Sequence, residues 1–120
     1  MGYSDQTRTV TINPTSGLII KSCGAIQSPA LGAGHEISHA AEHDRIGTKA
    51  FENNLETPIV SVKNSPDGGM TVTYGTAPEE KRATTVESKI ANDLHEAQRK
   101  NYNDSKGTVT TCGPTSTTQC

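Results

Sequence analysis

Two histidines four residues apart, with a glutamate beside the first, are the residues best suited to chemistry in this chain. They form the segment His35-Glu36-Ile37-Ser38-His39. On a helix, four residues make slightly more than one turn, so both imidazoles lie on one face and can reach one ion at about 2.0–2.2 Å. This arrangement is typical of zinc hydrolases, in which the carboxylate, here Glu36, takes a proton from water activated by the metal.

The alternative interpretation is that these side chains decorate a solvated helix face. The flanking residues argue against it, because Leu31-Gly32-Ala33-Gly34 and Ala40-Ala41 are small or apolar. A solvent-facing helix would more often carry Lys, Glu and Gln at such positions. We therefore expect a closely packed helix that carries the metal-binding residues.

A catalytic zinc site has three protein ligands and one open position, so the two histidines need a third partner. Glu80 and Glu87 belong to a second predicted helix and lie about 10 Å apart along its axis, so only one can be the ligand. Glu87 is slightly favoured because it lies mid-helix in an apolar setting, whereas Glu80 also suits the first turn as a charge favoured by the helix dipole. His43 is a weaker candidate, since its ring would lie about 12 Å from that of His35.

Two helices and a hairpin are the clearest predicted elements. Ser28-Pro29 predicts a helix that carries the motif to about Arg45 and stops at Gly47. Thr76 to Glu79 has the form of a capping box, with Thr76 as the cap, and opens a helix to about Arg99. Its apolar stripe consists of Ala83, Val86, Ile90, Leu94 and Ala97. The hairpin joins 59–63 to 70–74 through a turn rich in Asn, Pro and Gly, and one of its strands could face the active site.

The remaining segments have weaker signals. Alternating residues predict a hairpin between the segments 7–12 and 17–21, and 47–57 is predicted as a loop or short helical turn. A strand is expected at 108–111, followed by a loose Thr-rich tail. We therefore expect one α+β domain over 1–120, a small zincin-like fold with N-terminal strands at 1–27, a catalytic core at 28–102 and the tail at 103–120.

Composition excludes some classes of function and bounds the core. The formal net charge is −2, which disfavours nucleic acid as a partner, and no apolar run is long enough to span a membrane. The N-terminal residues lack the pattern of a signal peptide. Hydrophobic residues make up only 31% of the chain, so a bound metal could supply part of the stability of a thin core.

Three cysteines allow at most one internal disulfide, and none of them forms a Cys-x-x-Cys pair. Cys23 with Cys112 is the preferred pairing. Three free thiols, Cys120 included, are an equally good alternative in a reducing compartment.

The segment from Gly32 to Tyr102 resembles a known family. It is similar to the M91-type zinc metallopeptidases, bacterial effectors that also occur as C-terminal toxin domains of Rhs-like polymorphic toxins. The shared features are His-Glu-Ile-Ser-His-Ala at 35–40, Glu79-Glu80, the run Val-Glu-Ser-Lys-Ile-Ala-Asn at 86–92, and Arg99-Lys100-Asn101-Tyr102. Departures are Glu-Ser in place of the usual Glu-Asn, the small Ser38 inside the metal motif, and a missing glycine-containing segment after the Glu-Glu pair, so substrate preference is not carried over.

The resemblance implies a secreted or injected bacterial endopeptidase that uses Zn²⁺ and is delivered as part of a larger protein. It also implies a protein substrate in a target cell and a cognate immunity protein. A donor is needed for the developing oxyanion, and Tyr102, His95 and Tyr74 are available. The resemblance favours Tyr102.

Two other classes of function compete with this prediction. One is a binding module, either a zincin-like fold without turnover or a small disulfide-stapled domain; the intact Glu36 argues against it. The other is a metal-dependent amidase or deaminase, and the deaminase pattern requires a Cys-x-x-Cys that is absent.

Overall fold

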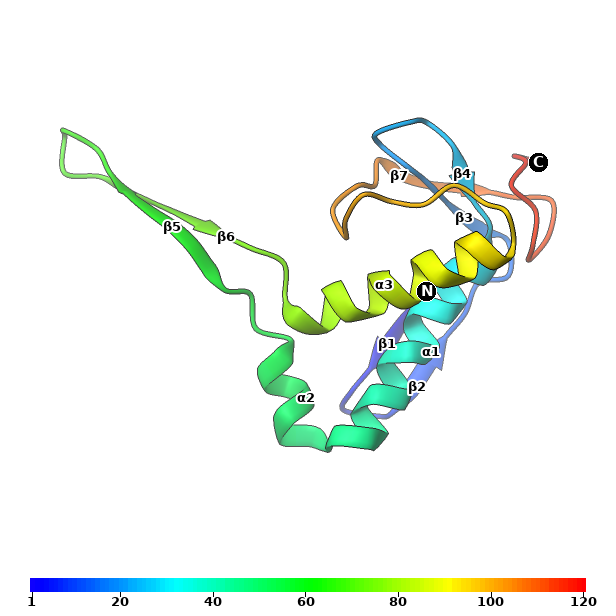
Figure 1. Ribbon diagram of the computed structural model, residues 1–120, viewed down its shortest axis with the longest axis horizontal. Helices are drawn as coiled ribbons and strands as arrows, with labels where there is room; N and C mark the ends of the chain where they lie inside the picture. Colours follow the sequence, from blue (N-terminus) through cyan, green and yellow to red (C-terminus); the bar gives the residue numbers. More distant parts are fainter.

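Two helices carry the predicted metal ligands, and they pack against each other in the computed structural model, which describes residues 1–120 (Figure 1). Helix α1 spans Pro29–Ile46 and helix α3 spans Pro78–Asp93. They meet closely at Gly34, where a Cβ atom would overlap the side chain of Ile90. The small residues of α1 therefore allow α3 to approach, as the sequence predicts.

Helix α1 agrees with its predicted limits. Pro29 lies in its first turn, and it ends at Gly47, whose φ of 86° suits glycine because most side chains disfavour that backbone region. Ser28 does not cap the helix with its side chain. Its hydroxyl and backbone N–H both donate to the Glu96 carboxylate, at 2.6 and 2.7 Å.

Helix α3 differs from its prediction at both ends. The predicted capping box is absent, because Ala77 is the residue before the helix and no side chain caps it. Glu79 instead turns toward α1. The helix ends at Asp93 rather than near Arg99, and His95 adopts a left-handed φ of 57° that reverses the chain. Of the predicted stripe, Ala83 is buried but Leu94 is exposed.

Helix α2 (Thr48–Asn54) replaces part of the predicted loop and agrees with its alternative, a short helical turn. Its one buried residue, Phe51, stacks on the ring of His43 with centroids 4.7 Å apart. The helix therefore packs an aromatic side chain against the last turns of α1.

The N-terminal strands pair differently from the prediction. β1 (Gly2–Ser4) pairs with β2 (Thr9–Thr11), while β3 (Ser16–Ile19) lies between β4 (Ile26–Gln27) and β7 (Gly107–Thr110) in an antiparallel sheet. The predicted hairpin of 7–12 with 17–21 is therefore wrong. Gly17 faces Val109 in the register, and a Cβ there would clash with the Gln27 carbonyl and Thr111. Close packing with distant segments, rather than the neighbouring strand, decides the partner of β3.

Strands β5 (Ile59–Asn64) and β6 (Met70–Tyr74) form the predicted hairpin. We call this hairpin, with its turn, the β5–β6 arm. Figure 1 shows that it projects from the body, starting where α2 and α3 approach each other. The prediction that one strand faces the site is wrong, because only the base of the arm, at Thr57 and Gly75, reaches the cleft described below.

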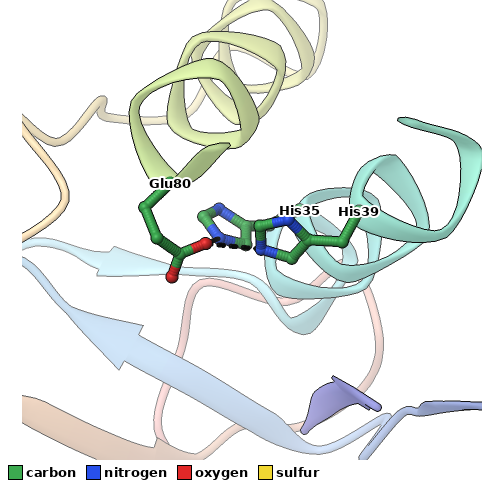
Figure 2. Close-up of side chains that lie close together, drawn as sticks. All are labelled: His35, His39 and Glu80. Carbon is green, nitrogen blue, oxygen red and sulfur yellow. Dashed lines mark hydrogen bonds and ion pairs between the residues drawn. The ribbon is translucent and has the colours of Figure 1, made fainter. Parts of the chain in front are cut away.

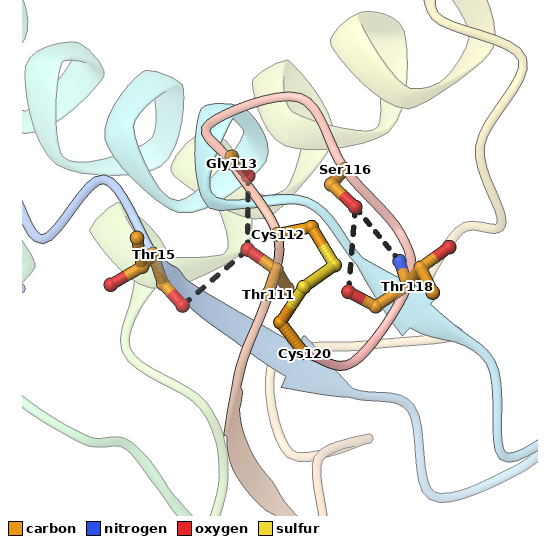
Figure 3. Close-up of a disulfide and its surroundings, with 7 residues drawn as sticks. All are labelled: Thr15, Thr111, Cys112, Gly113, Ser116, Thr118 and Cys120. Carbon is orange, nitrogen blue, oxygen red and sulfur yellow. Dashed lines mark hydrogen bonds between the residues drawn. A yellow bond between two sulfur atoms is a disulfide. The ribbon is translucent and has the colours of Figure 1, made fainter.

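The C-terminal tail is tied down rather than loose. Cys112 and Cys120 form a disulfide with their Cα atoms 5.0 Å apart, and Thr111 pairs with Gln119 in a β-bridge (Figure 3). The predicted pairing of Cys23 with Cys112 is therefore wrong, and Cys23 is free and exposed. Spacing alone does not reveal connectivity.

The disulfide loop also contacts the start of α1. The backbone N–H of Ala30, in the first turn of that helix, donates to the carbonyl of Pro114 at 2.9 Å. The hydroxyl of Thr111 donates to the Gly113 carbonyl at 2.9 Å, which supports the base of the loop.

The apolar core is thin, as composition predicts. Its fully buried members are Ile20, Leu31, Phe51, Ala77, Ala83 and Ala91. Polar and charged side chains outnumber them in the interior, and most of these belong to α1 or α3. None of the helices combines the length and the apolar character that a membrane span requires.

Removing the disulfide should lower the stability of the protein. Cys112→Ser is expected to reduce the free energy of unfolding by about 2–3 kcal/mol. Without the bond, the unfolded chain gains the conformational entropy that closure of this short loop removes. Urea unfolding followed by circular dichroism measures the loss. Cys23→Ser is the matched control and should leave stability unchanged, since Cys23 is exposed and unpaired; an equal loss in both variants would contradict the prediction.

Candidate metal centre

Three side chains from the two packed helices converge on one point. His35 and His39 come from α1 and Glu80 from the first turn of α3, and one ligand atom of each lies within 4.8 Å of the others (Figure 2). Glu80 Oε1 is 2.5 Å from His39 Nε2 and 3.4 Å from His35 Nε2. The same carboxylate oxygen thus contacts both imidazoles on their Nε2 side.

The donor set and its spacing fit a zinc ion. Two imidazoles and one carboxylate are an established ligand set for catalytic zinc, and ligands at about 2.0 Å in a tetrahedron are about 3.3 Å apart. The distance from His35 Nε2 to Glu80 Oε1 matches this separation, whereas the contact of Glu80 with His39 Nε2 is a closer ion pair. A metal would therefore take the place of protons that the two histidines now share with Glu80.

Each histidine also has a carboxylate on its other ring nitrogen. His39 Nδ1 is 2.6 Å from Glu79 Oε2, and His35 Nδ1 is 3.3 Å from Glu87 Oε1, near enough for an ion pair but not aligned as a hydrogen bond. Such partners fix the orientation and tautomer of metal-binding histidines and raise their basicity. Of the pair Glu79-Glu80, Glu80 is therefore the candidate ligand, and Glu79 is the carboxylate that holds His39.

Two arginines hold the supporting carboxylates. Arg82 donates to both oxygens of Glu79, at 2.6 and 2.8 Å, and also to the Ser38 carbonyl of α1 at 2.9 Å. Arg99 donates to both oxygens of Glu87, at 2.8 and 2.5 Å. Bidentate pairs of this kind combine strength with fixed geometry.

Glu87, the slightly favoured third ligand, does not reach the Nε2 side of the histidines. It is buried beside His35 Nδ1 and neutralised by Arg99, while the side chain of Glu80 remains 20% exposed at the edge of the site. The apolar neighbours of Glu87 in the sequence favoured it as the ligand. In the structure they bury Glu87 in a supporting position, where it contacts His35 Nδ1 and Arg99. The crossing of α1 and α3, which the sequence does not reveal, brings the start of α3 to the two histidines.

His43, the weaker candidate, lies outside the group of ligands. It is fully buried, its Nδ1 is 2.6 Å from the Tyr3 hydroxyl, and its Nε2 is 2.9 Å from the Thr48 hydroxyl. The histidine therefore joins β1 and α2 to α1. His43 thus supports the packing of these elements and is not a ligand candidate in this structure.

The site lies in a cleft with two hollows, of about 480 and 430 Å³. Glu36, Tyr102 and Asn103 line both hollows and mark their boundary. The first hollow contains His39 and Glu80, and the second contains His35. Other residues of the first hollow include Tyr3, Phe51, Leu55 and Thr76, and the second includes Leu18, Ser28, Gly32 and Thr108.

Glu36 is half-buried and outside the group of ligands, as expected for a proton acceptor rather than a ligand. Its position at the boundary of the hollows puts it next to whatever occupies the cleft. Glu80 thus belongs to the group that could hold a metal ion and Glu36 does not, although both carboxylates lie in one cleft.

Tyr102 covers the ligand His35. Their rings stack with centroids 5.9 Å apart, and Arg99 donates to the Tyr102 carbonyl at 2.8 Å. Interaction of the hydroxyl with Glu80, followed by burial, raises the pKa of Tyr102 to about 12, so it keeps its proton at neutral pH. The two other predicted donors, His95 and Tyr74, line neither hollow.

The metal-free cluster is a set of ion pairs. Burial alone would lower the pKa of His35, but contacts with Glu80 and Glu87 outweigh it and raise that pKa to about 9. Burial would also lower the pKa of His39, but its contacts with Glu80 and Glu79 outweigh burial, so the pKa of His39 is raised. The pKa of Glu80 falls well below its usual range, since the hydrogen bonds from both histidines outweigh its burial.

Sequence reasoning missed Arg82, Arg99 and Tyr3 as parts of this centre, and it did not assign Glu79 to a histidine. One signal was available for Arg82, because a residue three positions after Glu79 lies on the same helix face. Arg99 and Tyr3 approach through chain reversals that no local pattern encodes.

Comparison of this chain with protein-family models, with curated proteins and with solved structures finds no match. The interpretation of the site therefore rests on its residues and their geometry.

Zinc titration should show which carboxylate contributes most to zinc affinity. Glu80→Gln is expected to lose zinc where Glu87→Gln and Glu79→Gln still bind it, because removing a supporting partner costs only about 10–100-fold in metal affinity. Competition with a chromogenic chelator measures the three affinities. Weaker zinc binding by Glu87→Gln than by Glu80→Gln would reverse our assignment.

The metal-free protein should lose stability as the pH rises. The pKa of His35 is raised from 6.5 to about 9 on folding, so its contribution is fully present below about pH 6.5 and disappears as the pH passes 9. Thermal melting in the presence of a chelator, from pH 6 to pH 10, measures this loss.

The zinc-loaded protein is the comparison for this measurement. Zinc requires neutral imidazole, so its stabilising effect should grow with pH over the lower part of the same range. His35→Asn should flatten the slope of the metal-free protein; an unchanged slope would show that another group causes it.

Proposed function

We propose that this protein is a zinc-dependent metalloendopeptidase with a small zincin-like fold. The observation that carries the proposal is the convergence of His35, His39 and Glu80 in a cleft whose wall includes Glu36. Two imidazoles, one carboxylate ligand and a separate carboxylate base are the parts that peptide hydrolysis by zinc requires.

Each of these groups would have a separate part in peptide hydrolysis. Bound zinc would act as a Lewis acid toward the scissile carbonyl and lower the pKa of water toward 7. Glu36 accepts a proton from the attacking water and passes it to the amine that leaves. One C–N bond breaks, one C–O bond forms, and the proton taken from water ends on the new amine.

Tyr102 is the proposed donor to the developing oxyanion. Its hydroxyl keeps its proton because the pKa is raised to about 12, and its ring rests against His35 at the boundary of the hollows. A donor already held in place by packing stabilises charge without reorganisation during the reaction. Arg99 holds the backbone of this tyrosine and the carboxylate that supports His35.

The two hollows support cleavage within a chain rather than at its end. They extend from the boundary formed by Glu36, Tyr102 and Asn103, so a polypeptide can place residues on both sides of the scissile bond. An enzyme that removes C-terminal residues needs a cation to hold the terminal carboxylate. The arginine that lines the second hollow, Arg99, is already paired with Glu87.

We further propose that the peptidase is a bacterial toxin or effector domain that is secreted or injected and cuts a protein of a target cell. The disulfide of the tail supports export, because such bonds persist mainly in oxidising compartments. The resemblance of residues 32–102 to M91-type effectors, which rests on the short motifs in the sequence, is the reason for naming this class. A cognate immunity protein in the producing cell would be its natural partner.

The test is proteolysis by the zinc-loaded protein and by Glu36→Gln. We expect the variant to keep its zinc and its fold but to lose about 10²–10⁴-fold in rate, because it lacks the general base. Cleavage of unfolded β-casein and of a pool of fluorogenic peptides, followed by mass spectrometry, measures the rate.

Glu52→Gln is the matched control, since Glu52 is an exposed carboxylate on α2. It should cleave as the unaltered protein does. Equal activity of Glu36→Gln would exclude the proposed mechanism, and stoichiometric zinc without any cleavage would favour a zincin-like or disulfide-stapled binding module.

A further inference from the structure

The β5–β6 arm has one apolar face and one polar face. In the antiparallel register Ile59 lies opposite Tyr74, Val62 opposite Val72, and Asn64 opposite Met70. Residues that face each other across the two strands share a side of the ribbon. One side therefore carries Ile59, Val62, Met70, Val72 and Tyr74, with Asn64 at its turn end, and the other carries Ser61, Lys63, Thr71 and Thr73.

A β-bulge at Val60 adds Ile59 to the apolar side. The register shifts between Ile59 and Ser61, so Val60 is an additional residue on its strand. Strict alternation from Val62 would place Ile59 on the polar side, whereas the bulge returns it to the apolar side opposite Tyr74. Bulges that re-aim side chains are regularly placed rather than accidental.

The apolar face is open to solvent. Ile59, Val62, Met70 and Tyr74 are 60, 55, 66 and 60% exposed, and the arm extends away from the helices (Figure 1). An isolated two-stranded hairpin is only marginally stable in water, and contiguous exposed apolar patches indicate binding surfaces. This face therefore requires a partner.

The arm is rooted in the wall of the catalytic cleft. Thr57, Gly75 and Thr76, which precede β5 and follow β6, all line the first hollow, and Gly75 N–H donates to the Pro58 carbonyl at 2.7 Å. A chain that leaves this hollow past the base of the arm meets its strands next. The strands also have free edges, to which an extended chain can add by backbone hydrogen bonds.

We propose that the β5–β6 arm is a docking strip for the substrate polypeptide, which binds along it as an extended chain with apolar residues, remote from the bond that is cut. This inference rests on the proposed peptidase function. The charges of the arm cancel, with Lys63 and Asp67 as its ionic residues, so apolar contact and backbone pairing carry the binding. Affinity should therefore change little with salt.

Kinetics with long and short substrates test the strip. Unfolded, carboxymethylated α-lactalbumin is the long probe, and fluorogenic hexapeptides are the short ones. In the double variant Val62→Thr with Val72→Thr, the ratio of KM for the long probe to KM for the hexapeptides should rise about tenfold, because apolar contact is lost without a change in side-chain shape. The kcat for the long probe should stay the same.

The reciprocal double variant, Thr71→Val with Thr73→Val, changes the polar face of the same strands and is the control. Its KM ratio should not change. An unchanged ratio in the Val62 and Val72 variant, or an equal change in the control, would overturn the docking strip. Sedimentation that shows a dimer lost in the Val62 and Val72 variant would also overturn it, since the face would then bind a second copy.

Binding measured without turnover separates this inference from the peptidase proposal. Zinc-loaded Glu36→Gln should bind fluorescently labelled carboxymethylated α-lactalbumin, and adding the two valine substitutions should weaken binding about tenfold. If no substrate is cut but this binding depends on the valines, the peptidase proposal fails and the docking strip stands. Absence of binding, or binding that ignores the valines, overturns the strip even when peptides are cut.

Discussion

The need to neutralise buried charge governs the contact between α1 and α3. His35, His39, Glu79 and Glu87 are all less than a tenth exposed, and each has an oppositely charged neighbour. A buried ion without a partner is strongly destabilising, by about 3–5 kcal/mol when a pair is broken. The helices are thus held at their spacing by paired charges, in a chain whose apolar core is too small to do so alone.

This constraint explains why the centre extends well beyond its ligands. Glu79 and Glu87 each contact a histidine and are buried, and each also has an arginine partner, Arg82 for Glu79 and Arg99 for Glu87. Arg82 also bonds the Ser38 carbonyl, which joins the two helices directly. A divalent metal ion that binds here would replace the protons on the Nε2 atoms of the two histidines. The ion pairs of Glu79 with Arg82 and of Glu87 with Arg99 would stay in place.

Local patterns in the sequence were sufficient for the elements that carry the site. Pro29 and Gly47 marked the limits of α1, and the turn between Lys63 and Met70 marked the arm, because these signals depend on backbone geometry within a few residues. The pair His35 and His39 indicated a metal through its spacing alone. The α+β class followed from the same elements.

Features that depend on distant segments could not be predicted in this way. One of the two partners of β3, β7, lies about ninety residues further along the chain, and the choice between Glu80 and Glu87 depends on how two helices cross. Arg99 reaches Glu87 only because α3 ends at Asp93 and the chain reverses at His95. Side-chain periodicity contains no information on such crossings, which three-dimensional packing decides.

The last residues of the chain complete its first elements. β7 supplies an edge to β3, and Pro114, inside the disulfide loop, accepts the hydrogen bond from Ala30 in the first turn of α1. Contacts between segments so far apart close large loops and form late. During synthesis, therefore, the histidine-bearing helix gains its hydrogen bond to Pro114, and β3 gains its pairing with β7, only after residues 107–114 have been made.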